Sequence, residues 1–267
     1  MPDAVWYVYA VVPADTSLAG APSGVEGASV TALHEGGLAA LASPLDGREY
    51  AAERVSERAG DVAWVGPRAV AHDGVTTWAV GRGDAVPLPM FTLFASEGAV
   101  RAMLRERADA LARALAHVRG REEYAVRVYR HDDRLSASLA AVSPEVAELE
   151  RRAGGATPGQ RYLLSRKLED VRRAELRRVG AEVAHAVHER LAAAAADAAS
   201  DALPAAEGAG GTAVLNGAYL VPRDGVTAFR EALTALVAAH EPRGFRFEFT
   251  GPWAPYHFAR AAGPRES

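Results

Sequence analysis

The chain has 267 residues, of which 49% are hydrophobic and 24% charged, which is the composition of a globular protein with one or two domains. Its 30 basic residues are outnumbered by 34 acidic ones, which argues against a protein that works mainly by binding nucleic acid. The absence of cysteine excludes disulfides and thiolate chemistry and fits a cytosolic protein, and no stretch approaches the roughly 20 apolar residues of a membrane span.

The first half of the chain alternates short strands with helices. Hydrophobic periodicity and turn residues predict a buried strand at 5–12, two short strands in 29–45, a helix over 49–82 that breaks near Gly66-Pro67, a strand in 84–94, a helix over 97–119 and a strand at 122–130. Pro87 and Pro89 favour an edge position for the strand in 84–94, because proline gives no N–H to a ladder. A ferredoxin-like α+β domain over 1–131, with helices on one face of its sheet, satisfies this order.

The second half is expected to form another α+β domain, over 132–267. The pattern predicts a helix at 143–154 that begins after Ser143, a long helix at about 159–203, a flexible linker at 205–211, a strand at 212–222, a helix at 225–240 and a strand at 244–251. In the long helix the apolar row that ends at Val171 is displaced by five residues from the row that begins at Leu176. The helix is therefore not a uniform heptad seam.

No catalytic, cofactor-binding or metal-ligating residue is assigned. The sequence has no phosphate-binding loop, dinucleotide fingerprint or nucleophile elbow. Asp132 and Asp133 lie in a polar stretch and are interpreted as a solvated turn. Glu182 and His185 have the Glu-x-x-His spacing of di-iron helix bundles, but the second motif that such a site needs is missing, so a polar helix face is preferred.

Two alternative functions stay open at this point. The first is a metal-dependent enzyme that uses Glu182, His185 and His188 on the long helix. The second is a nucleic-acid-binding module in which Phe245, Phe247 and Phe249, which share one face of the last strand, stack on bases. The interpretation preferred for the phenylalanines is the buried face of a strand under the preceding helix.

The tail TGPWAPYHFA, residues 250–259, places three aromatic side chains on a segment stiffened by Pro252 and Pro255. Such a segment can lay Trp253, Tyr256 and Phe258 across a surface with little loss of chain entropy. Because large aromatic side chains are usually buried, we expect an internal clasp on the second domain rather than a binding site.

Three segments, in order, resemble the gas vesicle protein F/L family (GvpF/GvpL). They are WYVYAVVP at 6–13, VPLPMFTLFASEGAVRAML at 86–104, and LNGAYLVPRDGVTAFREAL at 215–233 followed by GPW-x-PY-x-F in the tail. Family members typically carry PxxFGT in the second segment, where this chain has PMFTLF. The residues that carry the resemblance, which we expect to be structural, are Trp6, Tyr7, Tyr9, Pro89, Phe91, Phe94, Asn216, Tyr219, Pro222, Phe229, Gly251, Pro252, Trp253, Pro255, Tyr256 and Phe258.

The resemblance implies a non-enzymatic accessory protein of gas vesicles, which acts in assembly or as a minor vesicle component. It implies no cofactor, no nucleic acid and a location at the gas vesicle in the cytoplasm. The implied partners are the major hydrophobic shell protein, of GvpA type, and other gas vesicle accessory proteins. It also implies two α+β domains, the first ferredoxin-like. The strand in 84–94 and the long charged helix are the candidate contact surfaces.

Overall fold

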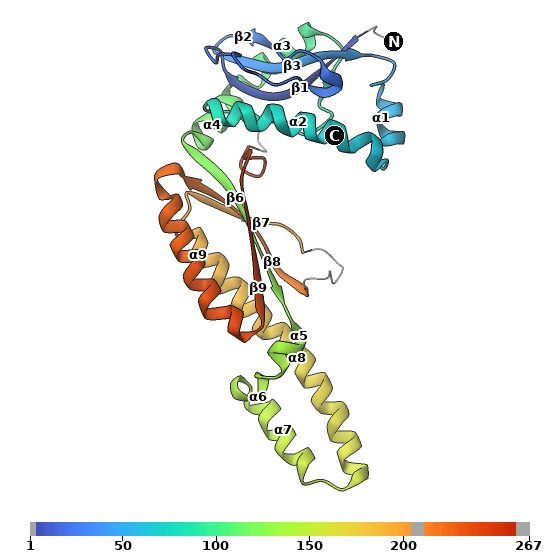
Figure 1. Ribbon diagram of the computed structural model, residues 1–267, viewed down its shortest axis with the longest axis vertical. Helices are drawn as coiled ribbons and strands as arrows, with labels where there is room; N and C mark the ends of the chain where they lie inside the picture. The colour runs from blue at the N-terminus through green and yellow to red at the C-terminus, as the bar shows by residue number, and fades with distance from the viewer. Residues whose placement is uncertain (1–3, 204–210, 260–267) are drawn as a thin grey trace. The chain divides into compact units, whose positions relative to one another are not determined.

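The computed structural model describes residues 4–203 and 211–259, which form a mixed α+β protein (Figure 1). The chain divides into two compact units. The N-terminal unit runs up to Glu123 and includes the residues from Pro252 onward, and the C-terminal unit is Tyr124–Gly251. This division differs from the expected boundary at residue 131. It also places the aromatic tail in the N-terminal unit, not in the second domain.

The N-terminal unit is built on a five-stranded antiparallel sheet of order β2-β3-β1-β4, in which β5 also pairs with β1. Its elements are β1 (Ala4–Pro13), β2 (Thr31–Glu35), β3 (Leu38–Asp46), α1 (Ala52–Arg58), α2 (Val62–Arg82), β4 (Val86–Pro87), β5 (Leu93–Phe94), α3 (Glu97–Glu106) and α4 (Ala108–Val118). The strand expected in 84–94 is therefore two short segments, and both lie at the sheet edge as predicted.

Helices cover both faces of this sheet rather than one. Val8 and Val11 of β1 pack with α3 and α4, whereas Tyr7, Tyr9 and Val12 pack with α2. A register shift between residues 8 and 10 changes the face to which the following side chains point. A strand buried on both faces has a nearly continuous apolar sequence, as VWYVYAVV does. Three strands precede the first helix, so this unit does not have the ferredoxin-like order expected for 1–131.

The helix expected over 49–82 breaks at a different place from the one predicted. It divides between α1 and α2, where the Asp61 carboxylate accepts hydrogen bonds from the N–H groups of Ala63 and Trp64. This cap starts a new helix at Val62, and Pro67 lies inside it. The helix expected over 97–119 is likewise two helices, α3 and α4, which meet at Arg107.

The C-terminal unit has a β-α-β-β-α-β order, whereas the ferredoxin-like arrangement had been predicted for the other half. Its sheet has the order β7-β8-β6-β9, which is the ferredoxin-like arrangement. Its elements are β6 (Arg121–Arg130), α5 (Asp132–Ser136), α6 (Leu139–Val142), α7 (Pro144–Gly154), α8 (Pro158–Ala192), β7 (Asp197–Ser200), β8 (Thr212–Pro222), α9 (Val226–His240) and β9 (Phe245–Trp253). Helices α8 and α9 lie on one face of the sheet (Figure 1).

Helix α8 has 35 residues and changes its packing partner along its length. In its first half it lies beside α7, to which Arg172 is tied by an ion pair with Glu150. Beyond the five-residue step that ends at Leu176, it packs on the sheet, where Gly180 approaches Val214 of β8. The step in the apolar pattern therefore marks the change of partner.

The alanine-rich stretch after residue 192, predicted as the end of α8, instead forms strand β7, which pairs with β8. Strand pairing overrides the helix propensity of alanine there. Apart from Gly211, the linker expected at 205–211 lies outside the described residues.

Candidate functional site

A chain of buried hydroxyl and imidazole groups lies between the sheet and α2 of the N-terminal unit. The Tyr7 hydroxyl lies 2.9 Å from His72 Nδ1, and His72 Nε2 lies 2.9 Å from the Tyr256 hydroxyl. The Tyr7 oxygen also accepts a hydrogen bond from the N–H of Phe91 at 3.1 Å. All these contacts are satisfied when the Tyr7 hydroxyl donates to Nδ1 and His72 carries its proton on Nε2. Tyr256 then donates to Thr76 Oγ1 at 3.4 Å.

Burial keeps the hydrogen-bonded groups Tyr7, His72 and Tyr256 neutral. His72 is 4% exposed, and burial lowers its pKa from 6.5 to about 4, so the imidazole is neutral near pH 7. Burial also raises the pKa values of Tyr7 and Tyr256 above the usual value for tyrosine. These neutral hydrogen bonds connect strand β1, through Tyr7, with the tail, through Tyr256, without an ion pair.

Tyr9, the neighbouring signature residue, makes a second buried set of contacts. Its hydroxyl donates to Ser43 Oγ at 3.1 Å and accepts from the N–H of Val25 at 2.9 Å. Gly24 is needed beside it, because a Cβ at that position would lie 2.1 Å from the Tyr9 oxygen. Burial raises the pKa of Tyr9. Both tyrosines of the opening strand therefore use their hydroxyls inside the protein.

The aromatic tail is tied to the N-terminal unit by more than Tyr256. Both oxygens of the buried Glu123 carboxylate contact His257, one through the backbone N–H at 3.1 Å and one through Nδ1 at 2.5 Å. Pro255 is buried and Phe258 is partly buried. Trp253, by contrast, is 45% exposed. The clasp is internal, as the composition of the tail predicts, but its main anchors are Tyr256 and His257.

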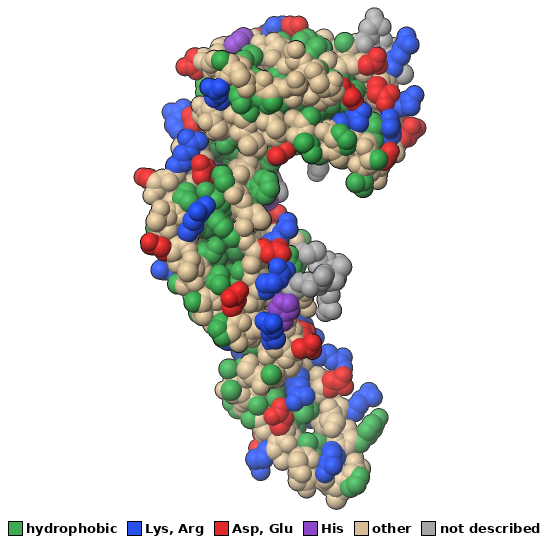
Figure 2. Space-filling model, in the orientation of Figure 1, with side chains coloured by type: hydrophobic (Ala, Val, Ile, Leu, Met, Phe, Trp, Pro, Cys, Tyr) green, Lys and Arg blue, Asp and Glu red, His purple; other side chains and the backbone are tan. Residues whose placement is uncertain are grey.

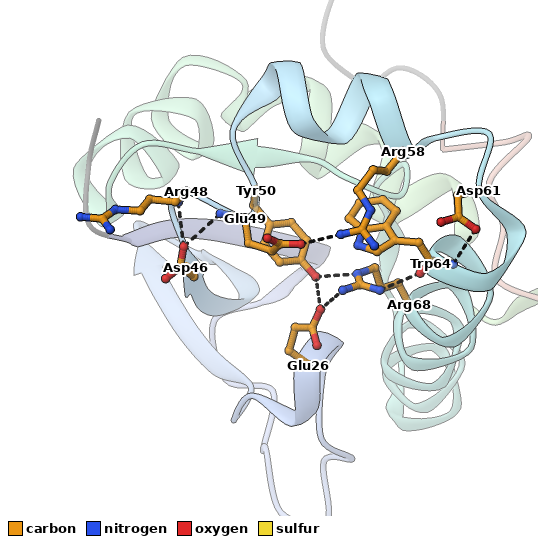
Figure 3. A network of polar contacts seen from close by, with 9 residues as sticks. All are labelled: Glu26, Asp46, Arg48, Glu49, Tyr50, Arg58, Asp61, Trp64 and Arg68. Atoms are coloured by element: carbon orange, nitrogen blue, oxygen red, sulfur yellow. Dashed lines mark hydrogen bonds and ion pairs between the residues drawn. The ribbon is translucent and has the colours of Figure 1, made fainter.

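An aromatic and charged network, which the sequence did not single out, lies around Tyr50, Trp64 and Arg68 (Figure 3). Tyr50 and Trp64 belong to the same buried cluster as Tyr7 and Tyr9. The Arg68 guanidinium donates to the Tyr50 hydroxyl and to the Glu26 carboxylate, and lies 4.2 Å from the centre of the Trp64 ring. Tyr50 also donates to Glu26 at 2.8 Å. Burial, and then the hydrogen bond to Glu26, raise the pKa of Tyr50. The spacing of Trp64 and Arg68, one helical turn apart, is the only signal that sequence reasoning offers for this network.

Two strained residues converge on the network. Among the described residues, Glu26 and Phe91 are the non-glycine residues with positive φ, at 58° and 64°. Glu26 contacts Tyr50 and Arg68, and the ring of Phe91 stacks on Trp64 with centroids 5.3 Å apart. Such a backbone conformation costs about 1–3 kcal/mol and persists where surrounding contacts enforce it. A hollow of about 490 Å³ opens beside Tyr50. The network therefore joins the N-terminal loop, the end of the sheet and α2.

The remaining signature residues of the N-terminal unit line the sheet edge. Trp6 of β1 pairs with Phe94 of β5, and both pack against α3 and α4. Pro89 is exposed and lies between β4 and β5.

In the C-terminal unit, the signature residues are divided between core and surface. Tyr219 and Phe229 are fully buried, with ring centroids 5.4 Å apart, and the Tyr219 hydroxyl lies 3.1 Å from His188 Nδ1. Asn216 Oδ1 accepts a hydrogen bond from Arg127, and Pro222 is partly buried. At the end of β9, Gly251 and Pro252 are exposed, and Gly251 has a φ of 123°. The structural role of this set as a family signature stays a prediction.

The structure does not bring the proposed metal ligands together. Glu182 is engaged by Arg178, His185 is exposed, and His188 is turned toward Tyr219. Within residues 4–203 and 211–259, no group of three or more His, Asp or Glu side chains is placed to hold a metal ion. Asp132, interpreted as part of a solvated turn, instead binds Arg130 at the start of α5.

The phenylalanine face of β9 is part of the core. Phe245 is buried, and Phe249 stacks on Tyr124 with centroids 5.2 Å apart and rings 14° from parallel. Phe247 is partly buried against the same core. Hydrophobic side chains gather over the middle of the C-terminal unit in the view of Figure 2. A stacking platform for bases would need these rings to be free, which they are not.

Comparison with known proteins decides the family. Residues 5–260 match the family described as "Gas vesicle synthesis protein GvpL/GvpF". The chain belongs to the GvpL/GvpF family. It is 31% identical over 265 residues to gas vesicle protein L of Streptomyces sp. (strain CB03234), with 97% of this chain and 94% of that relative covered.

Solved structures of GvpF share the GvpL/GvpF fold seen here. The structure of GvpF from Anabaena sp. PCC7120 matches with a TM-score of 0.74, and that from Microcystis aeruginosa with 0.67. Each is 16% identical and covers 96% of this chain and 98% of its own length. The likeness confirms the predicted α+β class. No helix in the described part of the chain is both long and apolar enough to cross a membrane.

Proposed function

We propose that this protein is a non-enzymatic accessory protein of gas vesicles, which acts in the cytoplasm and binds the GvpA-type shell protein or other gas vesicle proteins during assembly. The observation that supports this is the family match over residues 5–260, together with 31% identity to a gas vesicle protein L. The structure adds that two of the three residues suggested for metal catalysis, Glu182 and His188, are engaged elsewhere.

Of the two contact surfaces expected, the helical one is favoured. The β4–β5 edge offers little backbone for an added strand, because Pro87 and Pro89 have no N–H and the pairing to β1 is interrupted between them and Leu93. Near the N-terminus of α8, the side chains of Tyr162 and Leu163 are 64% and 68% exposed among mainly charged neighbours. Exposed apolar side chains of this kind are suited to a hydrophobic partner.

The test is co-purification of the full chain with the shell protein and the other vesicle proteins. We expect Leu163→Glu to reduce recovery of the partner without changing the melting temperature. Val62→Glu, at a site on α2 that is 82% exposed, is the matched control. The proposal is abandoned if the wild-type chain recovers no vesicle protein and a deletion strain still makes normal vesicles.

A further inference from the structure

A hollow of about 450 Å³ in the C-terminal unit carries more positive than negative charge. The end of β6, the middle of α8 and the start of β8 form its walls, and its charged lining is Arg130, Asp132, Arg173 and Arg177. The volume falls in the range of about 300–1,000 Å³ that ligand pockets occupy. Three guanidinium groups against one carboxylate leave an excess of two positive charges.

Arg130 is built into the wall of this hollow. Its side chain is 7% exposed, Nε and Nη2 donate to the Asp132 carboxylate, and Nη1 donates to the Leu176 carbonyl at 2.8 Å. Gly180 makes room for it, because a Cβ there would lie 3.0 Å from Nη1. A guanidinium has five N–H groups, so two remain without an acceptor among the described residues. Asp132 is already occupied by this arginine.

The other two arginines differ in their partners, since Arg173 has exposed acidic neighbours and Arg177 has none among the described residues. Arg177 is exposed and makes no hydrogen bond or ion pair with any residue that the structure describes. Arg173 pairs with Glu169 at 3.1 Å, but both side chains are mostly exposed, and such pairs contribute little. The mutual repulsion of neighbouring guanidinium groups would be relieved by an anion placed between them.

The hollow also has an apolar part. Leu203, which is 46% exposed, lines it together with Leu176 and Val214. A ligand that satisfies both parts has a carboxylate and an apolar group side by side. Arginine favours carboxylates because its planar fork forms two parallel hydrogen bonds with them.

We propose that this hollow is a binding site for an acidic peptide segment of a partner protein. The carboxylate lies between Arg130 and Arg177, and a neighbouring apolar side chain packs against Leu203. The carboxylate belongs either to an Asp or Glu side chain or to the C-terminus of the partner. The site does not depend on the gas vesicle role, because a synthetic peptide alone can test it.

Fluorescence anisotropy at low ionic strength tests the proposal with the full-length chain. One labelled peptide has blocked ends and the sequence Leu-Glu-Asp-Leu, and a second has no acidic side chain but ends in leucine with a free carboxylate. Each has an uncharged twin, made with Gln and Asn or with an amidated end. We expect one acidic peptide to bind, its uncharged twin to bind about tenfold more weakly or worse, and the affinity to fall as salt is added.

Two substitutions place the binding in the hollow. Arg177→Gln is expected to weaken binding by about tenfold, because it removes one charged donor. Arg166 is an exposed arginine of α8 outside the hollow, and Arg166→Gln, the control, is expected to change binding by less than about twofold. Gly180→Ala, which displaces Arg130, should weaken binding as well. Circular dichroism checks that each variant is folded. Binding by the side-chain peptide or by the C-terminal peptide identifies the source of the carboxylate. Absence of binding by both peptides, or equal losses in the Arg177 and Arg166 variants, overturns the proposal.

Discussion

The strongest test of the clasp is the removal of one oxygen atom, in Tyr256→Phe. The hydroxyl is 2.9 Å from His72 Nε2 and 3.4 Å from Thr76 Oγ1, inside a chain of groups that burial keeps neutral. Phenylalanine keeps the ring but leaves the buried Nε2–H without an acceptor. A buried polar group left unsatisfied costs about 1–3 kcal/mol.

This cost corresponds to a fall in melting temperature of roughly 2–12 °C, at about 2–4 °C for each kcal/mol in a chain of this size. Differential scanning calorimetry measures it directly. Tyr162→Phe is the matched control, since it removes the same atom from a side chain that is 64% exposed on α8. Equal melting temperatures for the two variants would refute the idea that the tail is held by its polar contacts.

Three further predictions concern His72, the core residue Phe229 and the network residue Arg68. Burial lowers the pKa of His72 in the folded state to about 4, so the neutral imidazole stabilises the protein fully above pH 6.5. As the pH drops from 6.5 to 4, the free energy of unfolding measured in urea titrations should fall by up to about 3 kcal/mol. A free energy that stays constant over this pH range would contradict the buried, neutral state of His72. Phe229→Ala should lower the free energy of unfolding by about 3–5 kcal/mol, since the ring is fully buried, and a loss below 1 kcal/mol would mean that the core has been misread. Arg68→Lys should destabilise the protein by about 1–3 kcal/mol, because lysine cannot donate to Tyr50 and Glu26 at once as the planar guanidinium does. Denaturation followed by tryptophan fluorescence measures this loss. Arg48→Lys is the control and should have no effect, because the Arg48 side chain is outside the network.

Local signals in the sequence identified most elements correctly. Ser143 was predicted to begin a helix, and its hydroxyl accepts the N–H of Val146 at the start of α7. Gly66-Pro67 misled the prediction because it resembles a helix break. The cap at Asp61 starts α2 before Gly66, and the helix continues through Pro67 although proline removes one of its hydrogen bonds.

Long-range pairing is what the sequence could not supply. Tyr7 and Tyr256 are each recognisable as large aromatic residues, but nothing in their surroundings indicates that both contact His72, which is 65 positions from one and 184 from the other. The same limit explains why the tail was assigned to the wrong unit. Glu26 was missed for another reason, since its left-handed conformation is usual for glycine and gives no signal at a glutamate.

The return of the segment after Gly251 to the first unit has a consequence for how the chain is made. Domains usually fold during synthesis from the N-terminus. Here His72 and the buried Glu123 have to wait for Tyr256 and His257, which are translated 184 and 134 residues after them. The N-terminal unit is therefore completed only after the whole C-terminal unit, Tyr124–Gly251, has been translated. A shortened chain that ends at residue 123 leaves a buried carboxylate without its partner, and a chain stopped by premature termination is incomplete in its first unit as well as in its second.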